Sequence, residues 1–151
     1  MRAVIQRVKQ ASVTVNNRVV SEIGQGLCVL IGITHDDTPE DADYIAKKLT
    51  TLRLFEDFNG KPWKANVKEG GLEILSVSQF TLFAVTNKGA KPDFHLAMPS
   101  KDSRPFYEAF LEKLRELHAP EKVKDGEFGA MMDVGIVNDG PVTVFIDSKD
   151  K

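Results

Sequence analysis

An apolar run from Leu27 to Ile33 constrains the fold of this chain more than any other feature. Only Gly32 interrupts the run, and Gly24 and Gly26 precede it. A strand that faces water on one side alternates apolar with polar residues, whereas a strand covered on both faces is apolar throughout. The run therefore predicts a strand at the centre of a sheet.

Other segments predict further strands. Apolar and polar residues alternate in residues 2–8, 12–15 and 19–23, and Asn16-Asn17 supplies a hairpin turn between the last two segments. The longest strand candidate runs from residue 72 to residue 83. Near the C-terminus, residues 131–137 and 142–147 predict two strands, and the residues between them, 138–141, predict a hairpin turn.

Two helices are also predicted. The first has Pro39 at its first position and its cap at Asp37 or Thr38, and two acids in its first turn complement the helix dipole. The second has its cap at Asp102 or Ser103. Its expected buried stripe is Phe106, Phe110, Leu114 and Leu117. Strands outnumber helices, so we expect mixed sheets with both helices on one side.

Composition narrows the class of protein. The chain has 151 residues, 42% of them apolar, which suits one compact domain over residues 1–151 with a solvated tail at 148–151. No apolar stretch approaches the roughly 20 residues that cross a bilayer, so we expect no membrane contact. The only cysteine, Cys28, lies in the apolar run, which favours a packed thiol and a cytoplasmic, reducing location. A net charge of −2 argues against sequence-independent coating of nucleic acid, so any RNA contact should be local.

Side chains for a conventional hydrolytic site are scarce. Such a site needs a nucleophile, a base and an orienting acid that meet in space. The three histidines, His35, His95 and His118, fall at a strand end, in a loop and at a helix end, where structural roles are the ordinary case. No His or Cys pair has metal-ligand spacing, and there is no glycine-rich phosphate loop or dinucleotide fingerprint. We therefore expect no metal and no cofactor.

Two features remain unusual. In residues 76–83, hydroxyl and amide side chains interrupt an otherwise apolar strand, and their ordinary interpretation is a half-buried strand whose Ser and Thr face solvent. Gly140-Pro141 stands at the head of a strand, where proline removes a hydrogen-bond donor and fixes its own φ. Taken alone, that pair is ordinary turn chemistry.

Together, these two features resemble the signature motifs of the D-aminoacyl-tRNA deacylase family, Ser-Gln-Phe-Thr-Leu and Asn-X-Gly-Pro-X-Thr. Here the motifs are residues 78–82 and 138–143, and the resemblance runs over nearly the whole chain. One departure is Lys91-Pro92-Asp93-Phe94, where many bacterial members carry Arg-Pro-Ser-Phe. This version is similar to the eukaryotic branch of the family.

The resemblance implies a mixed α/β (α+β) protein of the D-tyrosyl-tRNA deacylase-like fold, a three-layer β/β/α arrangement of barrel-like sheets with two main helices on one side. It implies a homodimeric hydrolase that acts on the aminoacyl-tRNA 3′ end and releases free D-amino acid and tRNA. The Gly140–Pro141 peptide of one subunit is expected to be cis and to enter the partner's site, where its carbonyls accept hydrogen bonds from the substrate ammonium. An L side chain would collide with this clamp, whereas glycine would pass, so glycyl-tRNA(Ala) is an expected second substrate.

Since no convincing base is present, we hypothesise that the backbone N–H groups of Phe80 and Thr81 stabilise the oxyanion, while the substrate's 2′-hydroxyl positions water. Thr81 as a nucleophile ranks second, because threonine needs an adjacent base. Ser78 and Gln79 are expected to bind the aminoacyl or adenosine end, and Arg7 to support the partner's Gly-Pro turn or to meet phosphate. A non-enzymatic RNA-binding module is the alternative from another class, and the absence of a dense basic stripe argues against it.

Overall fold

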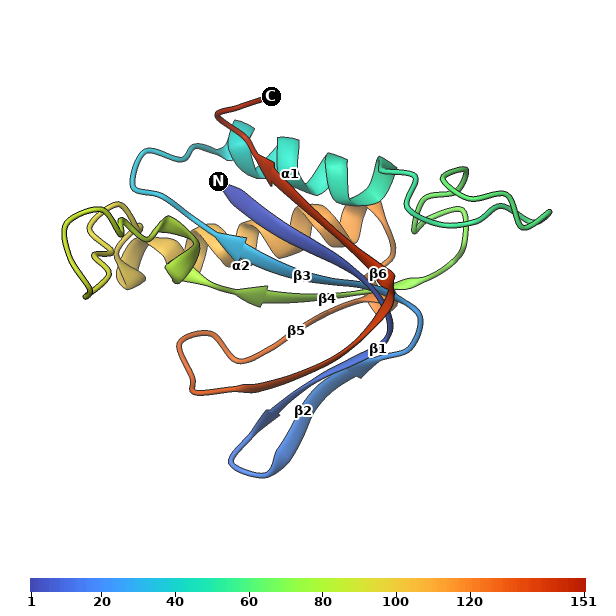
Figure 1. The fold of residues 1–151 in the computed structure, drawn as a ribbon, viewed down its shortest axis with the longest axis horizontal. Coiled ribbons are helices and arrows are strands. Elements are labelled where there is room, and N and C mark those ends of the chain that lie inside the picture. The colour runs from blue at the N-terminus through green and yellow to red at the C-terminus, as the bar shows by residue number, and fades with distance from the viewer.

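The computed structural model describes residues 1–151 as two α-helices packed on one side of a strongly curved six-stranded sheet (Figure 1). In chain order the elements are β1 Arg2–Val15, β2 Arg18–Ile23, β3 Gly26–Gly32, α1 Pro39–Thr51, β4 Glu73–Ser78, the 3₁₀ helix η1 Phe80–Phe83, α2 Ser100–Leu117, the 3₁₀ helix η2 Pro120–Lys122, β5 Val123–Asp125 and β6 Asp133–Asp147. The strand order is β2-β1-β3-β4-β5, and β6 pairs with β1. No helix is both long enough and apolar enough to cross a membrane.

The apolar run forms β3, and its predicted place at the centre of the sheet is confirmed. β3 is antiparallel to β1 and parallel to β4. Leu27, Val29 and Ile31 are buried in a cluster shared with both helices, whereas Cys28 lies in a second cluster. Successive side chains of a strand point to opposite faces, so the two clusters cover the two faces of β3. This double burial explains why β3 shows no polar alternation.

The two clusters divide the protein into three layers. The first cluster lies between the sheet and the helices, where Ile45 of α1 and Phe110 of α2 pack against the strands. The second lies where the second half of β1 pairs with β2 and with the first half of β6, and it includes Val13 and Ile23. The mixed α+β class, the curved barrel-like sheet and the helices on one side are thus confirmed (Figure 1).

The helices differ little from their predicted positions. α1 begins at Pro39, as expected. α2 begins at Ser100, earlier than the caps predicted at Asp102 or Ser103, because the Pro99 carbonyl accepts hydrogen bonds from the N–H groups of both residues. The buried face of α2 is Ser103, Tyr107, Phe110, Leu111 and Leu114, with Phe106 and Leu117 partly buried against the core.

The strand predicted at residues 72–83 is wrong in its second half. β4 ends at Ser78, and Phe80–Phe83 form η1. The expectation that the hydroxyls of this strand face solvent is also wrong for Ser76, which is fully buried. Its Oγ shares a 2.7 Å hydrogen bond with the Tyr107 hydroxyl. The partner comes from α2, so no local pattern could reveal it.

The hairpin predicted at residues 138–141 is wrong as well. β6 is one strand, and both of its halves pair antiparallel with β1. Asn138 pairs with Val8 and Thr143 with Gln6, so residues 139–142 bulge from the ladder opposite the single residue Arg7. The strands predicted at 2–8 and 12–15 are likewise one continuous strand, β1.

The predicted solvated tail begins later than expected. Ser148 is buried, accepts a 2.9 Å hydrogen bond from the Met1 ammonium and donates a 2.7 Å hydrogen bond to Asp41. Burial raises the pKa of Asp41, but hydrogen bonds from Thr38, Ser148 and Lys149 outweigh burial and hold this pKa below its ordinary value. The tail therefore joins both ends of the chain to the start of α1.

Candidate active site

The first motif forms the junction between β4 and η1. The Gln79 N–H donates to the Ile31 carbonyl at 2.7 Å, which ends the pairing of β4 with β3. The chain then tightens, and the Leu82 N–H donates to the Gln79 carbonyl at 3.3 Å. The motif that suggested a continuous strand is thus a sharp turn at the end of the parallel strands.

No loop carbonyl and no side chain accepts a hydrogen bond from the backbone N–H groups of Phe80 and Thr81. They belong to the first turn of η1, where a helix has no internal partner for its N–H groups. Both residues are exposed. Two successive donors are therefore free to face an anionic oxygen, the arrangement that stabilises a tetrahedral intermediate.

The side chains of the first motif bond to one another rather than to a base. Gln79 Nε2 donates to Thr81 Oγ1 at 2.6 Å. The Thr81 hydroxyl has no hydrogen bond to a histidine, a lysine or a carboxylate. His95 is paired with Asp93, and His118 Nε2 is hydrogen-bonded to a backbone carbonyl at 2.7 Å. The structure therefore contains no side chain poised to activate Thr81.

The long loop between η1 and α2 forms one wall beside η1. The Phe80 ring meets the edge of the Phe94 ring, with centroids 5.1 Å apart and planes at 74°. The backbones of Val85 and Asp93 exchange two hydrogen bonds, which close this loop. The hydrogen bond from His95 lowers the pKa of Asp93. Lys91, which stands where the similar bacterial motif has Arg, is exposed.

Arg2 fixes the far end of η1, a role that sequence reasoning missed. Its Nη1 donates to the Leu82 carbonyl at 2.8 Å, and its guanidinium lies 4.4 Å over the Phe83 ring. Asp147 holds Arg2 through a 3.0 Å ion pair. An arginine near the end of a strand carries no local signal for such a contact, because its acceptor lies 80 residues away along the chain.

The second motif forms the bulge of β6. The Gly140–Pro141 peptide is cis, as the resemblance implies, and Gly140 has φ of 123°. Arg7 Nε donates to the Asp139 carbonyl at 3.1 Å, and Arg7 Nη1 donates to the Leu54 carbonyl at 2.8 Å. Arg7 therefore supports the Gly-Pro turn of its own chain, whereas sequence reasoning expected it to support the partner's turn.

The two motifs do not meet within one chain. Arg7, which holds the Gly-Pro turn, pairs with Leu27, whereas Gln79 bonds to Ile31 further along β3. At about 3.3 Å per residue, this separates the motifs by roughly 13 Å along the strand. Figure 1 shows the yellow-green segment after β4 at one end of the sheet and the bend of β6 at the other.

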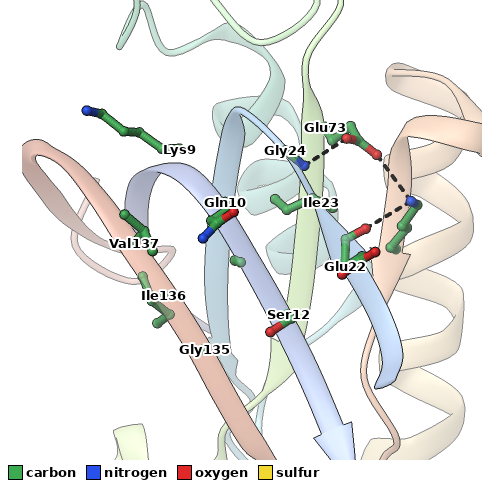
Figure 2. A pocket seen from close by; sticks show the side chains of 12 residues that line it. Lys9, Gln10, Ser12, Glu22, Ile23, Gly24, Glu73, Gly135, Ile136 and Val137 are labelled. Carbon is green, nitrogen blue, oxygen red and sulfur yellow. Dashed lines mark hydrogen bonds and ion pairs between the residues drawn. The ribbon is translucent and has the colours of Figure 1, made fainter. Parts of the chain in front are cut away.

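A separate cavity of about 610 Å³ opens between β1, β2 and β6 (Figure 2). Its charged side chains are largely engaged, since Glu73 accepts from the Gly24 N–H at 3.0 Å and pairs with Lys124 at 3.2 Å. Lys9 extends away from the hollow. No residue of either motif lines this cavity. No group of three or more His, Cys, Asp or Glu side chains in the structure is arranged to hold a metal ion.

Comparison with known proteins gives a consistent result. The family model described as D-Tyr-tRNA(Tyr) deacylase matches residues 4–147. A D-aminoacyl-tRNA deacylase of Dictyostelium discoideum is 56% identical over the whole of both chains. D-aminoacyl-tRNA deacylase 1 of Danio rerio is 55% identical over 98% of this chain and 71% of its own. A solved structure described as a c-Myc DNA unwinding element binding protein superposes with a TM-score of 0.93, at 52% identity, over 97% of this chain and 98% of that chain.

The family model and the relatives named as deacylases cover nearly the whole of this chain, so the chain is an enzyme, a deacylase. Within that class, the chain belongs to the D-Tyr-tRNA(Tyr) deacylase family.

Proposed function

We propose that this enzyme hydrolyses the ester between a D-amino acid and the terminal ribose of tRNA, and so removes D-amino acids before they reach translation. The family supports the reaction class. The observation that carries the mechanism is the pair of unbonded N–H groups at Phe80 and Thr81. They are fixed donors in a turn that Arg2 anchors, and fixed donors need little reorganisation as charge develops on the carbonyl oxygen.

The energetic demand on such a site is modest. An aminoacyl ester is already more reactive than an amide, and a thousandfold acceleration lowers the barrier by about 4 kcal/mol. Two backbone donors can supply that amount. The substrate's own 2′-hydroxyl then positions the attacking water, which accounts for a site without a protein base. Thr81 as a nucleophile is the less favoured mechanism, because its hydroxyl is bonded to the Gln79 amide.

The active form is a homodimer in which each Gly140–Pro141 turn enters the site of the partner. The separation of the two motifs within one chain supports this arrangement, since a site that uses both needs a second subunit. β6 also pairs with β1 only, and it exposes Val137 and Phe145. A long edge strand with exposed apolar side chains is a surface suited to another subunit.

This arrangement explains how the enzyme distinguishes mirror-image substrates. D and L amino acids carry the same groups and differ only in their directions from Cα. The Gly140 and Pro141 carbonyls bind the ammonium, so an L side chain is directed into the clamp and rejected. Ser78 and Gln79, at the junction of β4 and η1, bind the aminoacyl or adenosine end of the substrate. Glycine has no side chain to reject, so glycyl-tRNA(Ala) is a second substrate.

Release of tyrosine from matched D- and L-tyrosyl-tRNA tests this function. We expect rapid release of the D-amino acid and release of the L-amino acid at the uncatalysed rate, with glycyl-tRNA(Ala) hydrolysed as well. The measurement is acid-precipitable label over time, with buffer alone as the control. Equal cleavage of D and L substrates would contradict rejection by the Gly-Pro turn, and tight binding of both without turnover would favour the RNA-binding module.

The reducing cytoplasm is the location that we propose. Cys28 is the only cysteine, and it is a buried free thiol. Burial raises the pKa of Cys28 to about 11, so the thiol is protonated and unreactive at neutral pH. An inert packed thiol suits a protein that neither forms disulfides nor uses cysteine chemistry.

A further inference from the structure

A projecting loop carries two exposed aromatic side chains that the proposed chemistry does not use. We call residues 56–64 the finger loop; it lies in the green segment that extends from the end of the fold where β6 bends (Figure 1). Phe58 is fully exposed at 104% and Trp63 is 55% exposed. The base of the loop is firmly held, because Phe55 and Ala65 are both buried and form a bridge. Large exposed rings on an anchored loop indicate an interaction surface.

The tip of the finger loop is an ordered turn. Asp57 Oδ1 accepts hydrogen bonds from the N–H groups of Asn59 at 2.8 Å and Lys61 at 2.9 Å. The carboxylate of Asp57 is therefore engaged in the turn, while the side chains of Lys61 and Lys64 remain exposed. Two acids and two lysines leave the loop without net charge. The rings, rather than net charge, dominate what this surface can bind.

Trp63 is held in an unusual backbone conformation. Its φ is 60°, a left-handed value that a bulky residue rarely adopts, and such backbone conformations cluster at functional sites. The Arg7 guanidinium lies 5.9 Å from the centre of the Trp63 ring. Arg7 also bonds to Asp139 in the Gly-Pro turn. One arginine therefore links the position of the finger loop to that of the turn.

We propose that the finger loop binds unpaired bases of single-stranded RNA by stacking on Phe58 and Trp63, with Lys61 and Lys64 beside the phosphates. This inference rests on the proposed function, in which the Gly-Pro turn lies in the partner's site. The finger loop of the same subunit then lies beside that site, where the single-stranded 3′ end of the bound tRNA enters. Stacking on aromatic rings accepts any base, and the exposed Lys61 and Lys64 supply positive charge beside the rings for the RNA backbone.

Trp63 is the only tryptophan in the chain, so its fluorescence reports on the finger loop alone. The probe is a short single-stranded RNA with the 3′-terminal sequence of tRNA. We expect this RNA to quench the fluorescence, and a duplex of the same sequence to leave it unchanged. Phe58→Ala should weaken binding about tenfold, the loss of one stacked base. Lys64→Ala should reduce the slope of log affinity against log salt by about 0.7. Lys47→Ala on α1 is the matched control and should leave this slope unchanged.

Steady-state kinetics on D-tyrosyl-tRNA separate this inference from the deacylase proposal. Phe58→Ala should raise KM about tenfold and act on KM rather than on kcat. D-selective release by the wild type, without quenching and without a KM effect, would overturn the RNA contact alone. Quenching without any D-selective release would support the RNA contact and contradict the deacylase. A shift of Phe58→Ala toward monomer in sedimentation, with RNA affinity unchanged, would make the loop a subunit contact and overturn the inference.

Discussion

Replacing Phe80 with proline should lower kcat for D-tyrosyl-tRNA by about 100- to 1000-fold, the effect of removing one oxyanion donor. Proline lacks the backbone N–H, and its fixed φ suits the first turn of a helix. The substitution therefore removes a donor that has no partner within η1 while keeping the turn. Single-turnover measurement of kcat, with circular dichroism to confirm folding, gives the result directly.

Three matched variants separate the backbone from the side chains. Phe80→Ala removes the ring contact with Phe94 but keeps the N–H. Thr81→Ala removes the hydroxyl that Gln79 contacts and keeps the second N–H. Both should retain kcat within about tenfold of the wild type. Phenyllactate at position 80 keeps the ring and replaces only the N–H with oxygen, and it should behave like proline. Near-complete loss of turnover in Thr81→Ala, with the fold intact, would instead favour the nucleophile.

Gly26→Ala should destabilise the protein by about 3 kcal/mol, at the upper end for an overpacked site. Gly26 pairs with Glu73 at the start of the parallel β3–β4 ladder. A Cβ at position 26 would lie 1.9 Å from the Glu73 carbonyl oxygen, so the strands themselves must separate. Denaturant unfolding, with the slope compared between variants, measures the loss.

Gly24→Ala is the matched control for this prediction. A Cβ at position 24 would lie 3.8 Å from a Glu73 side-chain oxygen, which is an ordinary contact. Its stability should change by no more than about 0.5 kcal/mol. An equal loss in both variants would mean that the backbone contact between Gly26 and Glu73 does not limit stability.

The sequence predicts the elements whose signals are local. β3 shows its double burial in its own composition, and α1 shows its start at Pro39. Prediction from local sequence fails where the residue or strand that determines the structure lies far away along the chain. Ser76 is buried because Tyr107 of α2 satisfies its hydroxyl. Residues 138–143 form a bulge rather than a hairpin because β1 pairs with both halves of β6.

The candidate site also has some features that the sequence shows locally and others that only the tertiary fold creates. The two motifs identify the segments, but their chemistry lies in the backbone, which residue types do not display. The free N–H groups of Phe80 and Thr81 arise only because β4 stops at Ser78 and the chain tightens into η1. The sequence identifies Arg7 as a candidate site residue. Its contacts to Leu54 and Asp139, however, depend on the tertiary fold.

Subunit complementation tests the composite site most directly. Gly140→Ala should inactivate one component, because φ of 123° is strained for an L side chain and the new Cβ would lie 3.1 Å from Arg7 Nη2. Phe80→Pro inactivates the other component. In a mixed dimer the two lesions fall in one site and leave the other site intact.

Each variant alone should be inactive, and random re-association of equal amounts should restore about one quarter of wild-type activity, because half of the dimers carry one intact site of two. The measurement is D-tyrosyl-tRNA hydrolysis after the two variants are unfolded and refolded together, with separately refolded variants as the control. Activity at one quarter of the wild type is the predicted result. No recovery on mixing, with mixed dimers present, would contradict a site shared between subunits.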